Sequence, residues 1–477
     1  MSFVPPVDLA FQSLDRLESK SVALKDRGRK TLSIVSLARF LPDRRFSGAA
    51  LLDGRAVFAK VFAPGARGLV RAQREQKAHG KLSERGVLCP ALIDMGFVGS
   101  SPLQKTNSTG PSPVLIFERL ESQFDFQRLA PLEPDQADDQ LLLRQIAALA
   151  ALLGQHHANG IRQDDLHLGN FMSTKLGVQT LDFGSLSFDQ SLSPRERARN
   201  FAALLIQVDP RWYGAIAFLL SHYQKAGGEP LDQKIVRNEG KLLWEERRRR
   251  FARKVQRDSS ATRIHAIKFG TFAINRVWGA NLAGLEDALA QEILATARGK
   301  RAARVTIKWQ EDKLQLVFSK GVFREAHARN DWIEARQLGQ WGLPILRARL
   351  CLNRFPRRPV VAFEAGIADA IHDELWQRSD TGRSARRKLA KALARFDLFG
   401  CRMETLDREA ICGLDSSGRQ DLRFDSTKLR IRWLSPFDSS GPCPRILGIN
   451  QDFQEEIATA FASACASMRS AAASINP

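Results

Sequence analysis

Three side chains that offer oxygen ligands follow one another between Gly160 and Gly184. Asn170 comes five residues after Asp165, and Asp182 comes twelve residues after Asn170. Carboxylate and amide oxygens are the hard ligands that Mg²⁺ prefers, and an aspartate held in a loop can orient a hydroxyl group and accept its proton. We therefore expect a metal–nucleotide site in which Asn170 and Asp182 bind Mg²⁺ and Asp165 acts on an acceptor hydroxyl.

Two charged residues lie upstream of this stretch, in the order that such a site needs. Lys60 follows the apolar residues 57–59, and Glu75 comes fifteen residues later in a helical pattern. Taken alone, a lysine on a strand or a glutamate on a helix is usually solvated surface. Their order ahead of the loop favours a functional pair, and residues 57–60 resemble the V-A-I-K strand of kinases. This resemblance implies that Lys60 reaches nucleotide phosphates, that Glu75 holds it in place and that Ala59 lies near the floor of the adenine pocket.

The elements that must position these residues can be placed from local patterns. Two apolar runs, 46–52 and 55–62, flank Asp53-Gly54, which is a strong hairpin signal. A helical pattern over 74–82 ends before the punctuation of Gly86 and Pro90. Residues 1–40 are mixed and weakly helical.

The segments that lead into the central stretch are also recognisable. Residues 99–113 are predicted as a surface loop, and 114–120 as a buried strand that leads into a connector. In a kinase-like fold this strand would be the last of the small lobe, and its end, at Glu118, would lie beside adenine. Residues 141–159 repeat Ala, Leu and Ile at helical spacing and should deliver the chain to the loop. A short hairpin, 171–172 with 178–181, would bring Asn170 and Asp182 together.

The central motifs resemble those of protein-kinase-like enzymes. Asp165-Leu-His-Leu-Gly-Asn170 followed by Asp182-Phe-Gly is similar to the D-L-x-x-x-N loop and D-F-G of that superfamily. Gln163 stands where protein kinases have histidine, which weakens the case for a protein substrate. The D-L-H-x-G-N form is very like that of small-molecule phosphotransferases, and His167 is expected to pack or hydrogen-bond within the loop.

Residues from about 40 to 250 resemble the lipopolysaccharide core kinase family, the Kdo and heptose kinases of Gram-negative bacteria. The resemblance is carried by residues 58–60, 74–75, 86–90 and 160–170, and by Asp182. It implies ATP and Mg²⁺ as cofactors and transfer of the γ-phosphate to a sugar hydroxyl of the lipopolysaccharide inner core. It also implies that the partner is this core or another anionic sugar acceptor, at the cytoplasmic face of the membrane.

One departure from the kinase pattern concerns the loop that covers the phosphates. It should fall near Leu41–Arg45, which contains no glycine, although glycine normally lets the backbone approach phosphates closely. Arg44 or Arg45 would substitute through charge, or the segment is a solvated basic turn.

Composition points to an anionic partner without naming it. The formal net charge is +20, which suits nucleotide phosphates, phosphorylated lipid, an anionic membrane surface or nucleic acid. Residues 245–257 concentrate this charge, as a solvated face or a polyanion contact. Six scattered cysteines, and the absence of a leader-like or membrane-spanning run, favour a cytoplasmic protein with peripheral contact to the inner membrane. Nucleic acid is not expected.

Short sequence matches in the second half of the chain follow the order of the first half. Residues 317–320 echo 57–60, residues 334–344 echo 75–90, residues 360–364 echo 114–118 and residues 400–406 echo 160–166. In this alignment Thr405 and Ala410 replace Asp165 and Asn170, and Asp425 stands near the place of Asp182. The expected fold is α+β, with tandem bilobal protein-kinase-like domains: 1–250 catalytic and 251–477 degenerate. An unrelated domain over 255–477 is the alternative.

Three other functions remain open from the sequence. The D-L-H-x-G-N loop also suits a small-molecule phosphotransferase of the aminoglycoside or choline type. Another alternative is a pseudokinase scaffold for lipopolysaccharide assembly, in which both halves bind partners and neither catalyses a reaction. The intact Asp165, Asn170 and Asp182 disfavour this alternative. A nucleic-acid binder is suggested by charge alone and predicts steeply salt-dependent duplex binding.

Overall fold

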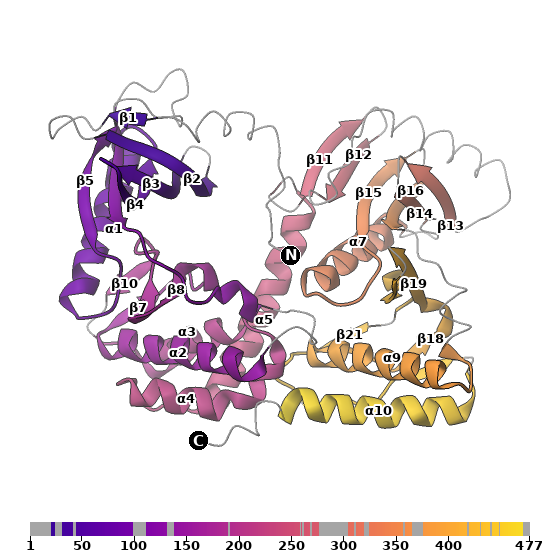
Figure 1. The fold of residues 1–477 in the computed structure, drawn as a ribbon. Coiled ribbons are helices and arrows are strands. Elements are labelled where there is room, and N and C mark those ends of the chain that lie inside the picture. Colours follow the sequence, from indigo (N-terminus) through magenta and orange to yellow (C-terminus); the bar gives the residue numbers. More distant parts are fainter. Residues whose placement is uncertain are drawn as a thin grey trace.

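The chain was analysed as a computed structural model, which describes most of its residues. These are 21–23, 31–41, 44–98, 111–130, 138–188, 191–257, 259, 262–267, 270–275, 304–309, 312–318, 324–355, 358–364, 375–416, 419–429, 431–438, 441–447 and 449–470. Two sheets stand at one side of the molecule, and a row of helices lies along the other (Figure 1).

The N-terminal sheet is antiparallel, with the strand order β1-β2-β3-β4-β6-β5. Helix α1 (Ala66–Glu84) connects β4 to β5. The turn between β3 and β4 is Asp53-Gly54, and both residues have positive φ, as a tight hairpin turn requires. The strands are β1 (Ser21–Ala23), β2 (Thr31–Leu41), β3 (Arg45–Leu52), β4 (Arg55–Phe62), β5 (Leu92–Val98) and β6 (Ser112–Glu118).

A mainly helical region follows this sheet. Helix α2 (Asp139–Ala158), capped by Asp138, delivers the chain to the short strand β7 (Ile161–Gln163), which pairs with β10 (Leu186–Phe188). Between them lies the hairpin of β8 (Phe171–Thr174) and β9 (Gly177–Thr180). The remaining elements are η2 (Phe126–Leu129), η4 (Leu168–Asn170), α3 (Pro194–Leu205), η5 (Pro210–Ala215), α4 (Ile216–Lys225) and α5 (Gln233–Val255).

The C-terminal sheet has the strand order β11-β12-β15-β16-β14-β13 and is also antiparallel. Its part β13-β14-β16-β15 matches β3-β4-β6-β5 in strand order, and helix α7 (Arg324–Gln340) connects β14 to β15 as α1 connects β4 to β5. The strands are β11 (Thr262–Ile267), β12 (Gly270–Asn275), β13 (Arg304–Trp309), β14 (Asp312–Phe318), β15 (Ala348–Phe355) and β16 (Arg358–Glu364).

The order of elements after this sheet also parallels the first half. Helix α9 (Asp380–Leu398) leads into β17 (Cys401–Met403), then η7 (Arg408–Ala410) and the hairpin of β19 and β20. Strand β21 then pairs with β17 as β10 pairs with β7. The other bounds are β18 (Thr405–Asp407), β19 (Ile411–Ser416), β20 (Arg419–Phe424), η8 (Ser426–Lys428), β21 (Ile431–Trp433), β22 (Arg445–Leu447) and α10 (Gln451–Ser470).

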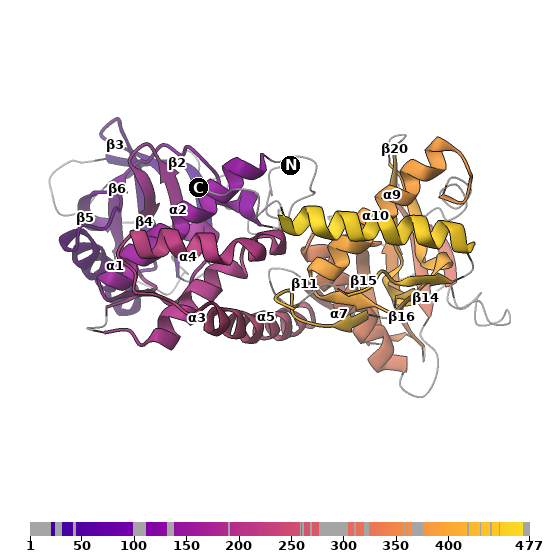
Figure 2. The same cartoon turned by 90° about the horizontal axis from the view of Figure 1, so that it is seen from below.

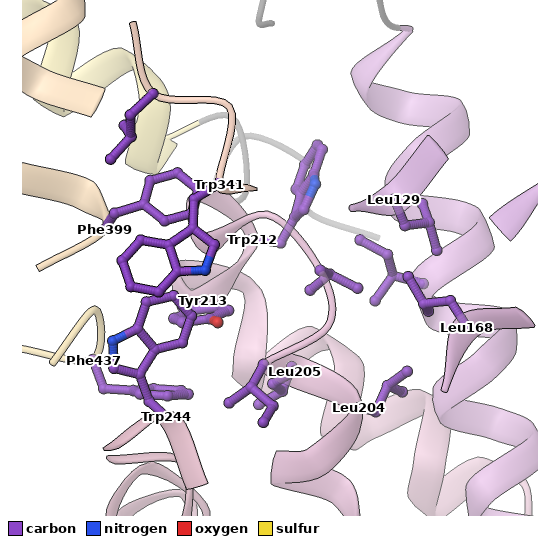
Figure 3. Close-up of a cluster of buried hydrophobic side chains, with 14 of the residues drawn as sticks. Leu129, Leu168, Leu204, Leu205, Trp212, Tyr213, Trp244, Trp341, Phe399 and Phe437 are labelled. Carbon is purple, nitrogen blue, oxygen red and sulfur yellow. The ribbon is translucent and has the colours of Figure 1, made fainter. Parts of the chain in front are cut away.

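One hydrophobic core runs through both halves of the chain. Helix α5 carries Trp244, whose ring lies 4.8 Å from that of Trp341 in the C-terminal half. Tyr213 stacks on Phe437 at 4.3 Å, and Figure 3 shows these aromatic rings beside Leu205 of α3. Large buried aromatic side chains contribute much of the energy of a packed interface. The two halves of the chain therefore pack against each other as one body.

Two expectations about local structure were wrong. Residues 31–41 form the long strand β2 rather than weak helix, and two irregularities in its pairing with β3 interrupt the alternation that would reveal a strand. Helix α1 begins at Ala66, well before the predicted 74–82, after the breakers Pro64 and Gly65. Within the described part of the chain, we find no helix that is long and apolar enough to cross a bilayer.

Candidate active site

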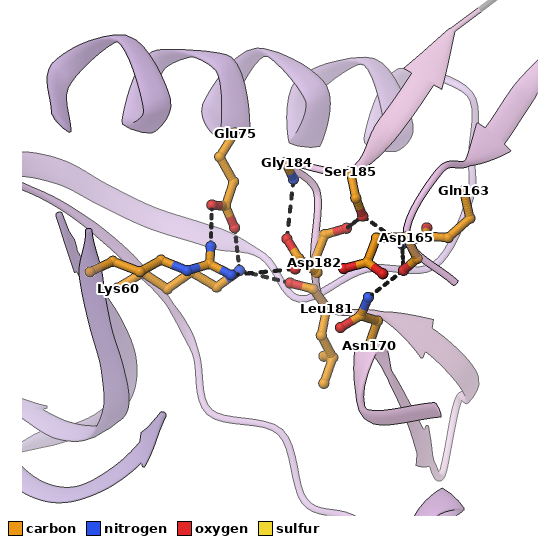
Figure 4. A network of polar contacts seen from close by, with 10 residues as sticks. Lys60, Glu75, Gln163, Asp165, Asn170, Leu181, Asp182, Gly184 and Ser185 are labelled. Atoms are coloured by element: carbon orange, nitrogen blue, oxygen red, sulfur yellow. Dashed lines mark hydrogen bonds and ion pairs between the residues drawn. The ribbon is translucent and has the colours of Figure 1, made fainter. Parts of the chain in front are cut away.

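The pairing of Lys60 with Glu75 is the first feature of the site. Strand β4 carries Lys60 and helix α1 carries Glu75, and the lysine Nζ forms an ion pair with Glu75 Oε1. Both side chains are almost fully buried. The same Nζ donates a hydrogen bond to the main-chain oxygen of Leu181, at 2.8 Å. The pair therefore ties the sheet to the segment that carries Asp182 (Figure 4).

Phe183, the residue after Asp182, is anchored under helix α1. Its ring is fully buried and makes an edge-on contact with His79 at 5.0 Å, and it lies 5.5 Å from Phe117. The Lys60 ammonium lies 5.1 Å from the same ring. In protein-kinase-like sites the packing of this phenylalanine separates active from inactive arrangements. Here it accompanies a formed lysine–glutamate pair, which is one requirement of the active arrangement.

Asp165 and Asn170 lie together in the loop after β7. The Asn170 amide nitrogen donates to the main-chain oxygen of Asp165 at 2.8 Å, which leaves the amide oxygen to face elsewhere. Asp165 is exposed, and its carboxylate makes no hydrogen bond or ion pair with a described residue. Gln163 supports the loop from below by donating to Ser185 Oγ at 2.7 Å. The position that holds histidine in protein kinases is thus a structural support here.

Asp182 is brought to Asn170 by the hairpin of β8 and β9. The Leu181 nitrogen donates to the Asn170 main-chain oxygen at 2.8 Å, so the chain returns directly beside the loop. Asp182 Oδ1 accepts a hydrogen bond from the Gly184 nitrogen at 3.3 Å. Figure 4 shows Asp165, Asn170 and Asp182 around one space. The structure therefore brings together the five charged or amide residues predicted for the site.

Arg45 was only partly anticipated. Its guanidinium lies 2.8 Å from Glu75 Oε2 and 3.3 Å from Asp182 Oδ2, and so links two of the carboxylates of the site. Arg44 is exposed. The glycine-free segment before β3 therefore places a cation among the carboxylates, and the solvated-turn interpretation holds for Arg44 alone.

The two residues predicted beside adenine occupy neighbouring strands. Ala59 is buried in β4 and faces Gly48 and Ile116 across the ladder. Glu118 ends β6 opposite Val57, and its nitrogen donates to the Ala91 main-chain oxygen at 2.9 Å. The structure puts both residues on the sheet that carries Lys60, and their contact with a nucleotide stays a prediction.

The donor set fits Mg²⁺ bound together with phosphates. Asp182 and Asn170 offer oxygen atoms, and among the described residues no group of three or more His, Cys, Asp or Glu is arranged to hold a metal by itself. Mg²⁺ commonly keeps waters and is bound by one or two carboxylates plus the phosphates of a substrate. A site of two protein ligands is what this chemistry needs.

A cavity of about 590 Å³ opens beside Asp165. Helices α3 and α5 line it with arginines, most of which are tied to carboxylates: Arg199 pairs with Glu239 and Glu246, and Arg250 with Glu246. Arg247 differs, because it pairs with no carboxylate of a described residue and donates to the Ile206 main-chain oxygen instead. Burial lowers the pKa of Arg247. The sequence predicted a basic segment here but not that it faces Asp165.

His167 behaves as expected. Its Nδ1 accepts a hydrogen bond from the Gly169 nitrogen at 3.1 Å, which closes the turn before Asn170. Burial is the main cause that lowers the pKa of His167. The histidine therefore shapes the loop.

The equivalent positions of the C-terminal half follow from strand register. Gly160 and Gly400 both have positive φ, and Asp425 N donates to the Ala410 oxygen as Leu181 N does to Asn170, both at 2.8 Å. Ile411 pairs with Phe424 as Phe171 pairs with Thr180. The residue equivalent to Asp182 is therefore Ser426 rather than Asp425. Thr405 and Ala410 stand at the positions expected for them.

The strand register also shows that Lys320 is not the equivalent of Lys60, contrary to the expectation from the sequence. Glu118 lies opposite Val57, and Glu364 lies opposite Leu314. Counting along β14, the position of Lys60 is occupied by Val317, which is buried. Lys320 itself lies outside the described residues. Nothing equivalent to the Lys60 charge is present at this place in the C-terminal sheet.

Strand order, the helix after β4 and the Lys60–Glu75 pair together define the small lobe of a protein-kinase-like protein. The loop and the hairpin below this lobe bring Asp165, Asn170 and Asp182 together, and their roles stay a prediction. The chain thus has the fold of this superfamily.

Comparison with known proteins gives weak similarities. No protein-family profile and no curated protein matches the chain. WaaP in complex with acyl carrier protein is similar at 20% identity over 50% of this chain and 90% of that chain, with a TM-score of 0.32. The autoinhibited serine kinase domain of the giant muscle protein titin is similar at 13% identity over 44% of this chain and 65% of that chain, with a TM-score of 0.29.

The kinase domain of Mycobacterium tuberculosis PknI is similar at 12% identity over 44% of this chain and 95% of that chain, with a TM-score of 0.28. At such identities and TM-scores these similarities carry no argument. The assignment to the protein-kinase-like class therefore rests on the geometry of this chain.

Proposed function

We propose that this protein is an ATP- and Mg²⁺-dependent phosphotransferase that transfers the γ-phosphate to a sugar hydroxyl of the lipopolysaccharide inner core. The observation that carries the proposal is the convergence of Lys60, Glu75, Asp165, Asn170 and Asp182 on one space between sheet and loop. The resemblance of residues 40–250 to the core kinases supports the choice of acceptor.

Each residue has a definite task in this reaction. Lys60, held by Glu75, binds phosphate oxygens, while Asn170 and Asp182 hold Mg²⁺, which supplies charge neutralisation to the phosphates when bound. Asp165 holds the acceptor hydroxyl in line and accepts its proton. One bond forms between the acceptor oxygen and phosphorus, the bond from phosphorus to the leaving ADP oxygen breaks, and the hydroxyl proton passes to the Asp165 carboxylate.

The cavity beside Asp165 supports an acceptor that is not a cation. Its unpaired charges are those of Asp165 and Arg247, since the other acidic side chains of the described lining are engaged with arginines: Asp164 and Glu196 with Arg162, and Glu246 with Arg199 and Arg250. A polyamine-like acceptor such as an aminoglycoside would need free carboxylates there. A sugar that carries a phosphate or carboxylate has Arg247 as a partner.

We further propose a catalytic domain at 1–250 and a degenerate kinase-like copy at 251–477, whose boundary falls within helix α5. The shared strand order of the two sheets and the matching hairpins support a tandem duplication. Val317, Thr405, Ala410 and Ser426 stand at the places of Lys60, Asp165, Asn170 and Asp182. A copy with these residues has neither the phosphate-binding cation nor the metal ligands, so we infer that it transfers no phosphate.

Location is proposed on the same basis. We place the protein in the cytoplasm with peripheral contact to the inner membrane, because the acceptor implied by the resemblance is a membrane glycolipid and the chain carries a net charge of +20.

The test measures transfer of labelled phosphate from γ-labelled ATP to isolated lipopolysaccharide core. Wild type should label the core, and Asp165→Asn should reduce labelling by about 10²-fold or more while Mg-ATP binding is retained. Equal labelling by both proteins would overturn the assignment of Asp165. Mg-ATP binding without transfer to the core or to soluble amino sugars would favour the scaffold.

A further inference from the structure

A second cavity, of about 870 Å³, is lined mainly by residues that lie far in sequence from those of the candidate active site. Helices α9 and α10 run side by side across the base of the C-terminal half and form its walls (Figure 1, Figure 2). Asp139 of α2 and Arg211 of η5 also line it, and we call the part beside the buried Arg211 its inner end. Residues of both halves therefore contribute to it.

The α9 wall is a stripe of cations. Arg383, Arg387, Lys391 and Arg395 follow one another at intervals of four residues, and all four line the cavity. This spacing puts them on one helix face, about 6 Å apart along the axis and about 18 Å from end to end. Like charges at this spacing repel one another weakly, and an anion bound along the stripe would relieve this repulsion.

Two of these cations have no partner within the chain as described. Arg387 and Lys391 are exposed and make no hydrogen bond or ion pair with a described residue. Of the three acidic residues of the lining, Asp139 pairs with Arg211 at 3.1 Å and Glu456 pairs with Arg386 at 2.7 Å. Glu455 accepts a hydrogen bond from Gln451 Nε2 at 3.0 Å and pairs with no cation of a described residue. Five arginine and lysine side chains and three carboxylates line the cavity, so its net charge stays positive.

The inner end holds a buried donor that is not used. Arg211 is almost fully buried, and among the described residues no group accepts a hydrogen bond from its Nε. Arg395 is also buried there and lies 3.4 Å from Asp209. Arg211 belongs to the cavity lining, and a buried arginine nitrogen without an acceptor calls for one.

The α10 wall identifies the kind of anion. Thr459, Ser463 and Ser467 line it at intervals of four residues, with Ala460 and Ala464 between them. Small residues leave room, and hydroxyl groups can donate to an anion from the side opposite the arginines. A phosphate presents oxygens in several directions, so it can accept from arginine forks on one wall and from hydroxyls on the other at the same time.

We propose that the cavity between α9 and α10 binds an elongated ligand that carries two or more phosphate groups. The ligand is held by Arg387 and Lys391 at its outer part and by Arg211 at its inner end. This site is separate from the space around Asp165 and does not depend on the proposed phosphotransfer. Its chemistry suits either a soluble polyphosphate or the phosphorylated headgroup of a lipid.

The full-length protein should be titrated with tripolyphosphate by calorimetry, with the double variant Arg387→Glu/Lys391→Glu beside wild type. Binding should weaken about tenfold or more in the double variant. Lys388→Glu reverses one charge, which is half of the change in the double variant, on an exposed residue of the same helix outside the cavity lining, and should change binding by less than about twofold. An equal loss in this control would reduce the effect to general electrostatics and overturn the site.

A steric variant keeps the charges intact. Ser463→Trp should block the groove and weaken tripolyphosphate binding as strongly, whereas Ala462→Trp, on an exposed neighbour outside the lining, should not. Retained binding by Ser463→Trp contradicts the proposal. Unchanged thermal unfolding midpoints keep both comparisons independent of folding.

Vesicles separate the two sources of phosphate. Flotation should compare phosphatidylcholine vesicles that contain about one fifth cardiolipin, a lipid with two phosphate groups, with pure phosphatidylcholine vesicles. A lipid headgroup is the ligand if wild type binds the anionic vesicles and both Arg387→Glu/Lys391→Glu and Ser463→Trp lose this binding. A soluble ligand is assigned if wild type binds tripolyphosphate but not the vesicles. Wild type that binds neither probe overturns the proposal. Transfer of labelled phosphate, which depends on Asp165, should be unchanged in these variants.

Discussion

The guanidinium of Arg45 lies 3.3 Å from the carboxylate of Asp182, and its other nitrogen lies 2.8 Å from Glu75. Arg45 therefore forms an ion pair with a carboxylate that would bind Mg²⁺. Because the Asp182 carboxylate carries a single negative charge, Arg45 should compete with Mg²⁺ for it.

The first prediction concerns this competition. Arg45→Met should lower the Mg²⁺ concentration for half-maximal phosphate transfer by about three- to tenfold, which corresponds to roughly 0.7–1.4 kcal/mol. Arg44→Met removes the neighbouring exposed charge and should leave the Mg²⁺ dependence unchanged. The measurement is activity against Mg²⁺ at saturating ATP, backed by thermal unfolding with Mg²⁺ alone. A higher Mg²⁺ requirement in Arg45→Met would contradict the competition.

The second prediction concerns the buried pair. Glu75→Gln removes the charge that faces both Lys60 and Arg45, and breaking a buried pair costs about 3–5 kcal/mol because a charge is left uncompensated. Urea unfolding should show this loss, and phosphate transfer should fall about 10²-fold. Glu84→Gln, on an exposed residue of the same helix, should shift stability by less than about 0.5 kcal/mol. Equal effects of the two changes would refute a special role for the pair.

The third prediction concerns pH. Burial lowers the pKa of His156 to about 3 and that of His157 to about 4. An unfolded histidine titrates near 6.5, so below that pH the unfolded chain binds protons that the folded chain does not. The free energy of unfolding should therefore fall as pH drops from about 6.5 towards 4.

Urea unfolding at a series of pH values checks this dependence. His157→Gln removes one of the two titrating groups while keeping a side chain that can bond to Asn200 and Tyr223. Its stability should fall less steeply with acidification than that of wild type. Identical slopes in the two proteins would show that the pair does not control acid stability.

The fourth prediction concerns a close contact between the halves. A methyl group on Gly240 of α5 would lie 2.4 Å from the Phe437 ring, so Gly240→Ala should cost about 1–3 kcal/mol. Gly80 in α1 has open space around it, and Gly80→Ala should stabilise by up to about 1 kcal/mol through helix propensity. Thermal unfolding of both variants tests the difference. A stabilised Gly240→Ala would contradict the tight contact.

Local signals accounted for much of the fold around the site. The Asp53-Gly54 turn fixed the hairpin of β3 and β4, and the apolar repeat fixed α2. Strand β2 was not predicted because two irregularities in its pairing break the alternation of apolar and polar residues that is typical of a strand. Arg45 escaped because its contact with Asp182 joins residues 137 apart in the sequence, and no local pattern reports such a distance.

The repeat in the second half illustrates the same limit. Short matches indicated the order of elements, yet they aligned Lys320 with Lys60 and Asp425 with Asp182. Strand pairing moves these matches to Val317 and Ser426, because register depends on hydrogen bonds across the sheet rather than on similarity of short runs.

Helix α5 makes the two halves a single cooperative unit. Trp244 on this helix contacts Trp341, and Trp332 donates a hydrogen bond to the main-chain oxygen of Val255 at 3.1 Å. Melting either half would expose these rings to water and strip the other half of its packing. Scanning calorimetry should accordingly record a single unfolding transition. Residues 1–250 and 251–477, expressed as separate proteins, should be insoluble.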